Sequence, residues 1–216
     1  MLTELLELRK ELTLEIGNYS IRCGDSMEIM KSIESASVDC VITDPPYAGF
    51  GFGNTPKDYI DGLLPFVSEM LRCTKGEMDS KRFAISQPGR KMDLLSQRIP
   101  PTNYLRIPDA FADGRGDDAV FLLRNPVDMT QATEGSWTEL PDSEHPNHRN
   151  VNKMAPLITV MTKIGDTILD PFCGSAAIGL AAVLLGRNYI GIELGENRAT
   201  EADLRLAAVG ASGLAI

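Results

Sequence analysis

The stretch Thr167-Ile168-Leu169-Asp170-Pro171-Phe172-Cys173-Gly174-Ser175 decides the fold of this chain. Residues 167–170 are predicted to form a buried strand, and the turn at Gly174-Ser175 leads into an alanine-rich helix that ends near residue 185. A further strand at 188–192 and a helix that begins at Glu196 follow. This alternation predicts parallel strands that are covered by helices.

The rest of the chain continues the alternation, so we expect one α/β domain over residues 1–216, with a mainly parallel sheet and helices on both faces. Residues 125–150 are rich in Pro, Asp, Ser and Asn and form the longest irregular connection. The expected helices lie at 2–15, 27–33, 58–73, 90–97 and 151–163, and the expected strands at 20–23, 38–43, 83–86, 104–107 and 119–123. The predicted buried stripe of the helix at 58–73 consists of Leu63, Leu64, Phe66, Val67, Met70 and Leu71.

Length and composition are those of a globular protein. With 216 residues the chain is long enough for one well-buried α/β domain. No stretch approaches the apolar length of a membrane span, and the start of the chain is acidic rather than signal-like. We therefore expect no membrane association and a cytoplasmic location.

The cysteines and histidines do not form a metal-binding pattern. The four cysteines are scattered without a Cys-x-x-Cys pair, and Cys40 lies in an expected core strand, which favours reduced thiols over disulfides or zinc. His145 and His148 are three positions apart but have no Cys or acidic cluster near them. We expect no metal site.

The formal net charge of −9 argues against a dedicated high-affinity nucleic-acid binder, which usually has a basic surface. Residues 72–91 are a local exception, and two interpretations stay open for them: a basic strip on an acidic body, or an ordinary solvated charged face. The basic residues of this stretch are Arg72, Lys75, Lys81, Arg82, Arg90 and Lys91.

Asp44-Pro45-Pro46-Tyr47 directly follows the apolar strand at 38–43. Both prolines lack an N–H, fix φ and push the preceding residue out of the helical region, so the strand ends there. The Asp44 carboxylate, the Pro45 carbonyl and the Tyr47 ring are thereby presented at the carboxyl edge of the sheet, where α/β proteins bind ligands. Two acceptors beside an aromatic ring suit a flat heterocycle that carries an exocyclic NH2 group.

A second chemical site begins at the turn after residue 170. Backbone N–H groups at the start of a helix suit a polar ligand, and glycine lets that ligand approach the backbone. Glu193 ends the next strand 23 positions after Asp170, which is the usual distance for a carboxylate that accepts the hydroxyls of an adenosine ribose. The alternative is an ordinary βαβ unit with a surface Glu. The G-x-G-x-x-G of a dinucleotide site is missing, so S-adenosylmethionine, which has no pyrophosphate, fits better than NAD(P).

Together these motifs resemble the amino-directed DNA methyltransferases, which methylate adenine N6 or cytosine N4. The Asp-Pro-Pro-Tyr motif precedes the cofactor turn, as in the beta-type motif order of that family, and the resemblance covers almost the whole chain. Further similar segments are Gly24-Asp25-Ser26, Arg115-Gly116, and 145–150 in place of a His-Pro-x-x-Lys-Pro segment. The resemblance implies a Rossmann-like methyltransferase fold with seven strands, one of them antiparallel.

The chain departs from the family pattern in three places. Arg149-Asn150 stands where Lys-Pro is usual, which keeps a cation but loses a rigid turn. Ser175-Ala176-Ala177 replaces the common Ser-Gly-Thr, which implies a tighter cofactor turn. The irregular segment at 125–150 stands in place of a larger target-recognition region. The sequence specificity would therefore be low, the recognition sequence would be short, or a partner subunit would supply the recognition. Pairing into a homodimer would enlarge the surface that contacts DNA.

The resemblance also implies roles for individual residues. Asp44, Pro45, Pro46 and Tyr47 would be catalytic: Asp44 and the Pro45 carbonyl accept the two N–H bonds of the target amine, and Tyr47 stacks on a base that is flipped out of double-stranded DNA. The implied cofactor-binding residues are Asp25, Asp44, Arg149, Asp170, Phe172, Gly174, Ser175 and Glu193, and the implied DNA contacts are Lys57, Arg90 and Arg115.

Two of these assignments have plainer alternatives, and two phenylalanines of the loop after Tyr47 have two possible roles. Asp25 could receive the methionine ammonium or simply cap a helix. Arg149 could be an ordinary surface cation. Phe50 and Phe52 could close over the base, or they could be ordinary loop or core aromatics.

The implied activity is site-specific DNA methylation, as in restriction-modification systems. Adenine N6 is the first choice of target, because Asp in the first motif position is commoner in adenine enzymes of this arrangement and Ser in N4-cytosine enzymes. The alternatives are N4-cytosine methylation, an inactive relative that binds DNA or cofactor, and an RNA or protein glutamine methyltransferase.

Overall fold

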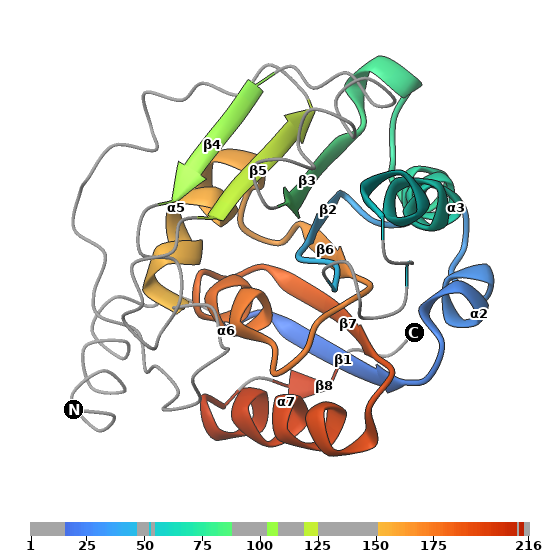
Figure 1. Ribbon diagram of the computed structural model, residues 1–216. Coiled ribbons are helices and arrows are strands. Elements are labelled where there is room, and N and C mark those ends of the chain that lie inside the picture. Colours follow the sequence, from blue (N-terminus) through green and yellow to red (C-terminus); the bar gives the residue numbers. More distant parts are fainter. Residues whose placement is uncertain are drawn as a thin grey trace.

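The computed structural model describes residues 16–46, 52, 55–87, 103–107, 119–124, 151–210 and 212–213 (Figure 1). The strands are β1 (Asn18–Cys23), β2 (Cys40–Thr43), β3 (Arg82–Gln87), β4 (Asn103–Ile107), β5 (Ala119–Arg124), β6 (Thr167–Asp170), β7 (Asn188–Glu193) and β8 (Ser212–Gly213). The helices are α2 (Ser26–Lys31), α3 (Pro56–Cys73), α5 (Val151–Met161), α6 (Ala177–Leu184) and α7 (Glu196–Ala208), with a short 3-10 turn, η1, at Met78–Ser80.

The strands form one sheet in the order β4-β5-β3-β2-β6-β7-β1-β8. β5 runs antiparallel to both β3 and β4, and the other pairings are parallel. Within the described residues the sheet has eight strands, so the expected number of seven is wrong by one. The additional strand, β8, has only two residues, which pair with Asn18 and Tyr19 of β1. A strand this short has no hydrophobic periodicity that a sequence pattern could reveal.

The sheet grows in opposite directions from the pair β2–β6. β3 lies beside β2 on one side, and β7 lies beside β6 on the other, although β2 and β6 are far apart in the chain. Helix α3 follows β2 and helix α6 follows β6, and the two helices pack on opposite faces of the sheet. This is a topological switch point, and open α/β sheets bind ligands at the carboxyl ends of the strands at such a point.

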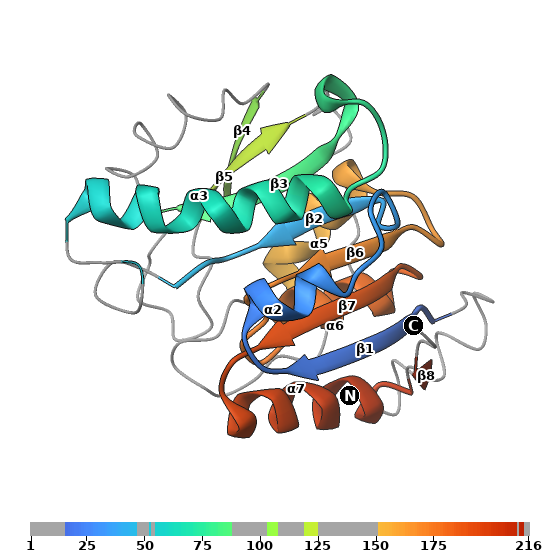
Figure 2. The same ribbon diagram turned by 90° about the vertical axis from the view of Figure 1, so that its right-hand side faces the viewer.

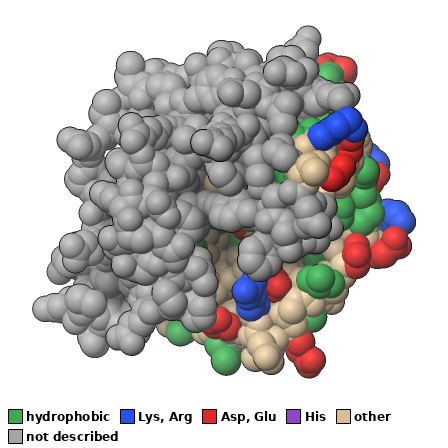
Figure 3. Space-filling model, viewed as in Figure 1, with side chains coloured by type: hydrophobic (Ala, Val, Ile, Leu, Met, Phe, Trp, Pro, Cys, Tyr) green, Lys and Arg blue, Asp and Glu red, His purple; other side chains and the backbone are tan. Residues whose placement is uncertain are grey.

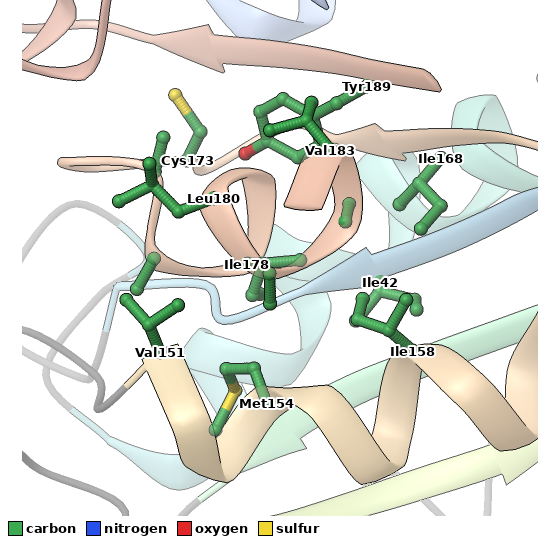
Figure 4. Packing of buried hydrophobic residues seen from close by; sticks show 14 of the residues in the cluster. Ile42, Val151, Met154, Ile158, Ile168, Cys173, Ile178, Leu180, Val183 and Tyr189 are labelled. Carbon is green, nitrogen blue, oxygen red and sulfur yellow. The ribbon is translucent and has the colours of Figure 1, made fainter. Parts of the chain in front are cut away.

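Helices cover both faces of the sheet (Figure 2), and a hydrophobic cluster lies between sheet and helices on each face. Helices α2 and α3 pack on one face, and the predicted apolar stripe of α3 is confirmed, since Leu63, Val67 and Met70 are buried there. Helices α5, α6 and α7 pack on the other face, where side chains of α5 and α6 meet Ile42 and Ile168 of the sheet (Figure 4). Both faces are therefore closed, and the strand ends remain as the place for a ligand.

Several expected elements extend differently or lie elsewhere. The strand expected at 38–43 is shorter, because Val38 forms only an isolated bridge to Thr74 before β2 begins. Helix α3 begins at Pro56, two residues earlier than expected, because the Thr55 side chain caps it by accepting from the Asp58 N–H. The helices expected at 2–15 and 90–97 and the connection at 125–150 lie outside the described residues.

Candidate functional site

The Asp-Pro-Pro segment and the cofactor turn lie side by side at the carboxyl edge of the sheet. The Thr43 hydroxyl, at the end of β2, donates to Asp170 Oδ1 at the end of β6 over 2.6 Å. Asp44 follows Thr43 and is half-buried, and Pro45 after it is buried. The chain therefore brings its two predicted motifs to one edge, at the switch point. Tyr47 lies outside the described residues.

Asp170 is buried within this edge and its carboxylate is engaged by the protein itself. Besides the Thr43 hydroxyl, Oδ1 accepts from the Phe172 N–H at 3.2 Å, and Oδ2 accepts from the Tyr189 hydroxyl at 3.0 Å. Burial raises the pKa of Asp170 to about 7, and the charge of Asp44 raises it as well, while the hydrogen bonds from Thr43, Tyr189 and Phe172 lower it. The carboxylate thus joins two strands and a turn, so its role at the site is to position other groups.

The cofactor turn contains two residues in left-handed backbone conformation. Gly174 has φ +53°, and a side chain there would meet no atom within 4 Å, so the backbone at this position faces open space. Ala176 has φ +61° and ψ +42°, which costs a residue with a Cβ about 1–2 kcal/mol. Ala176 stands where the family resemblance leads one to expect glycine, and its buried methyl group packs in the core cluster of α5 and α6. The turn between them is held by Arg205, which donates to the Ser175 carbonyl at 2.6 Å.

Glu193 is held against the cofactor turn. Its Oε2 accepts from the Gly174 N–H at 3.0 Å, and its Oε1 accepts from the Gly195 N–H at 2.9 Å. Each carboxylate oxygen keeps a second lone pair for another donor. The next residue, Leu194, has 73% of its surface exposed beside this carboxylate. Sequence reasoning missed Leu194, because its significance comes from an apolar side chain left in solvent at the edge that binds ligands.

Asp25 caps helix α2, so the plainer interpretation of this residue is confirmed. Its Oδ1 accepts from the Met27 N–H at 2.8 Å and from the Glu28 N–H at 3.2 Å. The neighbouring Gly24 N–H donates to the Glu193 carbonyl, which places Asp25 at the end of β1, beside β7. Strands β7 and β6 stand between β1 and β2, so Asp25 lies on the Glu193 side of the edge and not on the Asp44 side. Its neighbour Ser26 is buried and donates to the Pro171 carbonyl, which ties α2 to the cofactor turn.

Phe52 packs inward rather than over the strand ends. Its ring meets Phe172 of the cofactor turn edge to face at a centroid distance of 5.8 Å, and it meets Phe66 and Tyr59 of α3 at 5.2 and 5.7 Å. Gly62 of α3 makes room for it, since a Cβ there would lie 3.3 Å from the Phe52 ring. Phe52 is therefore a core aromatic, as the plainer alternative held, and it supports Phe172. Phe50 lies outside the described residues.

The described residues of the basic stretch serve structural contacts at the opposite, amino edge of the sheet. Arg72 pairs with Glu69, Lys75 with Asp39, and Arg82 with Asp166. Acidic and basic side chains are interspersed over the described part of the face in Figure 3. For these residues the interpretation as an ordinary charged surface holds.

The remaining predicted residues fall into two groups. Lys57 is exposed on the first turn of α3 and pairs with Asp61. Arg90, Arg115 and Arg149 lie outside the described residues.

In the part of the chain that the structure describes, the four cysteines are free thiols and no cluster of three or more His, Cys, Asp or Glu side chains could hold a metal ion. No helix in that part combines the length and apolar character needed to cross a membrane.

The groups at this edge fit S-adenosylmethionine. The Glu193 carboxylate suits the two hydroxyls of a ribose, the exposed Leu194 suits one face of an adenine, and the open backbone at Gly174 admits a chain. The acidic side chains of Asp44 and Glu193 lie at this edge beside Asp170, whose pKa of about 7 leaves it only partly ionised near neutral pH. Acidic groups suit a cofactor with a positively charged sulfonium.

Comparisons with known proteins find DNA methylases. Residues 111–203 match the N6/N4 family model described as DNA methylase. The proposed methylase YubD of Escherichia coli (strain K12) is 29% identical over 204 residues, which cover 86% of this chain and 89% of that protein. The solved structure of the M1.HpyAVI complex with S-adenosylmethionine superposes with a TM-score of 0.62 at 22% identity, covering 87% of this chain and 100% of the other. The cytosine-N4-specific PvuII DNA methyltransferase superposes with a TM-score of 0.68 at 18% identity, covering 88% and 87%.

The fold is therefore that of the S-adenosylmethionine-dependent DNA methyltransferases. Within that class, the match of residues 111–203 and the relative from Escherichia coli make the chain similar to the amino-directed DNA methylases, which act on adenine N6 or cytosine N4. The superposed M1.HpyAVI structure holds S-adenosylmethionine, and the matched family model is one of DNA methylases.

Proposed function

We propose that this protein methylates the exocyclic amine of a base flipped out of double-stranded DNA, with adenine N6 as the target. The observation that carries the proposal is the contact between the Asp-Pro-Pro segment and the cofactor turn, made by the Thr43 hydroxyl and the Asp170 carboxylate. It brings acceptors for an amine and a site for the methyl donor to the same edge of the sheet.

The catalytic task of this chain is to improve a poor nucleophile, because the lone pair of an exocyclic amine is conjugated into its ring. The cofactor supplies an electrophilic methyl group. Asp44 and the Pro45 carbonyl each accept a hydrogen bond from one N–H group of the amine, and these two bonds favour a tetrahedral geometry at the nitrogen. Acceptors that are held in place before the reaction also stabilise the positive charge that grows on the nitrogen. Pro45 is buried and Pro46 half-buried, so rigid rings hold these acceptors and reduce the cost of orienting the amine.

On the cofactor side, Glu193 receives the ribose hydroxyls while its bonds to Gly174 and Gly195 keep it oriented. Leu194 covers one face of the adenine, and Gly174 and Ser175 approach the methionine end. Phe172 is proposed as a further cofactor-binding residue, and the rings of Phe52 and Phe66 hold it in place. Arg149 is proposed as a cation at the methionine end.

On the nucleic-acid side, Tyr47 stacks on the flipped base. Flipping costs a few kcal/mol, and one aromatic stack contributes about 1–3 kcal/mol, so stacking offsets much of the cost without choosing the sequence. Lys57, Arg90 and Arg115 contact the phosphate backbone. We also propose that the chain pairs into a homodimer on DNA, which sedimentation of the protein with and without a duplex tests.

The preference for adenine rests on the residue type at Asp44, since both amines offer the same hydrogen bonds. The test is to incubate the purified chain with labelled S-adenosylmethionine and unmethylated genomic DNA, and then to digest the DNA and identify the modified nucleoside by mass spectrometry. N6-methyladenine is expected. N4-methylcytosine would keep the enzyme class and correct the base, whereas label found only in RNA or protein acceptors would overturn DNA as the substrate.

An inactive relative that only binds DNA or cofactor is the second candidate, and the left-handed Ala176 in the cofactor turn favours it. The same incubation separates the two, because a pure binder retains the cofactor in calorimetry and transfers no label to any acceptor. The presence of Asp44 favours the active enzyme.

A further inference from the structure

The end of β2 is joined to the end of β6 by side chains and not by the backbone. The parallel pairing of these strands runs through Cys40 with Ile168 and Val41 with Leu169 and goes no further. Beyond it, the Thr43 hydroxyl reaches Asp170 across 127 positions of sequence. Asp170 is in register with Gly191 of β7, and Thr43 with Ile85 of β3, so each strand end continues its pairing on the outer side only. The hydrogen bond from Thr43 therefore spans the place where the sheet opens at the switch point.

The Tyr189 ring lies in a slot made by two glycines, which aims its hydroxyl at the same carboxylate. A Cβ on Gly179 of α6 would lie 2.4 Å from the ring, and a Cβ on Gly191 of β7 would lie 2.8 Å from it. Neither glycine has a positive φ, so both provide space rather than an unusual backbone. In Figure 4 the ring lies beside α6 and near Cys173. The hydroxyl donates to Asp170 at 3.0 Å and also interacts with Cys173, and a phenylalanine would fill the slot without either contact.

We propose that Thr43 and Tyr189 are positioning residues for methyl transfer, which hold the β2 end that carries Asp44 against the cofactor turn through the Asp170 carboxylate. This inference rests on the proposed function. Thr43 directly precedes Asp44, so a backbone that can move at Thr43 would shift the Asp44 carboxylate away from the amine from which it accepts a hydrogen bond. A misplacement of about 1 Å can lower a rate by roughly a hundredfold, which is why such a bond matters more for turnover than for cofactor binding.

The charged state of Asp170 provides a readout that a purely structural role would not give. The groups that face it are Thr43 and Asp44 from β2, Tyr189 from β7, and the Phe172 N–H and Cys173 from the turn. The hydroxyl bonds favour the ionised carboxylate and lower its pKa, so removal of either hydroxyl raises that pKa further. If transfer needs the ionised carboxylate, the loss of activity on the acid side then begins at a higher pH.

The test compares Thr43→Val, Thr43→Ser and Tyr189→Phe with the wild type in single-turnover methyl transfer between pH 5.5 and 9, together with the Kd for S-adenosylmethionine. Thr43→Val is expected to lower the rate roughly ten- to a hundredfold with less than about threefold change in Kd. Thr43→Ser restores most of the rate. Tyr189→Phe is expected to lower the rate less than Thr43→Val does. Both Thr43→Val and Tyr189→Phe are expected to shift the acid limb of the pH profile to higher pH.

Matched controls remove the same groups elsewhere in the protein. Thr74→Val deletes a buried hydroxyl that donates to the Met70 carbonyl at the amino edge, and Tyr19→Phe deletes a tyrosine hydroxyl that donates to the Asp203 carbonyl. Both are expected to keep the wild-type rate and pH profile whatever they do to the melting temperature.

The outcomes separate the inference from the proposed function. A wild-type chain that transfers no methyl group overturns both. An active wild type in which Thr43→Val keeps the rate and profile within twofold, or in which Thr74→Val loses as much, overturns the inference alone. If Thr43→Val does not fold, Tyr189→Phe decides: an unshifted acid limb at full rate overturns the inference.

Discussion

The two edges of the sheet treat their carboxylates differently. At the amino edge, Asp39 pairs with Lys75 and Asp166 pairs with Arg82, and Asp39 also accepts from the Thr167 N–H. At the carboxyl edge, the bonds to Asp170 and Glu193 come from hydroxyls and backbone N–H groups. Neutral donors orient a carboxylate without pairing it with a cation, so an ionised carboxylate at this edge keeps its charge for a cationic cofactor and a developing positive charge. We therefore expect changes at the amino edge to affect stability and changes at the carboxyl edge to affect methyl transfer.

Among the substitutions that test the difference between the two edges, we expect the largest effect on methyl transfer at Asp44. Asp44→Ala removes an acceptor for the target amine, so we expect methyl transfer to fall below detection while S-adenosylmethionine binding largely survives. Single-turnover transfer and calorimetry measure the two quantities. Asp39→Ala is the matched variant at the amino edge and should keep transfer while lowering the melting temperature, because it loses its bonds to Lys75 and Thr167. Unchanged turnover in Asp44→Ala would remove the mechanism.

Glu193→Ala is expected to have the next largest effect, and it acts on the cofactor. The ribose would lose its bonds to a charged acceptor, and the loss of one such bond, worth about 1.5–3 kcal/mol, already raises the Kd for S-adenosylmethionine by roughly ten- to a hundredfold. Binding of DNA in the absence of cofactor should change little. Glu196→Ala, an exposed acid at the start of α7, is the control. Calorimetry that shows no loss for Glu193→Ala would contradict the ribose role.

Asp170→Asn tests how much the burial of an ionised carboxylate lowers the stability of the fold, because that cost depends on pH. The folded chain holds the pKa of Asp170 at about 7, above the value of 3.8 for a free side chain, so the folded state binds more protons between these values. The stability contributed by this group therefore falls as pH rises from about 4 to 7 and then levels off. Asp170→Asn stays neutral, so its melting temperature relative to the wild type should rise over the same range. Melting curves from pH 5 to 8.5 measure this, with Asp166→Asn as the amino-edge control; a difference that is flat with pH would refute the buried, raised pKa.

The smallest expected effect is at Ala176. Replacement by glycine relieves about 1–2 kcal/mol of left-handed strain but loses a buried methyl group worth about 0.8 kcal/mol and adds chain entropy. We therefore expect Ala176→Gly to change the free energy of unfolding by less than about 1 kcal/mol. Ala181→Gly, a buried alanine within α6, lacks the strain term and should be clearly more destabilising. Denaturant titration of both variants checks the order, and equal losses would show that the turn at Ala176 carries no strain.

Local patterns were enough to predict most elements of this fold. The strand at 167–170, the apolar stripe of α3 and the cap at Asp25 were all confirmed, because each depends on neighbours within a few residues. β8 was missed because two residues carry no pattern, and Leu194 was missed because exposure is not a property of sequence. Phe52 looked like a loop residue beside the motif, and only its neighbours in space show that it supports Phe172.

The amino-acid sequence by itself determined the alternation of strands and helices and the chemistry of the two motifs, because hydrophobic period, proline stereochemistry and side-chain type are local. Only the tertiary structure decided how the motifs meet, through a threonine, an aspartate and a tyrosine brought together from three strands. The reason is physical: a hydrogen bond between Thr43 and Asp170 depends on strand order and on the glycine slot that admits Tyr189, and these arise only when distant segments pack.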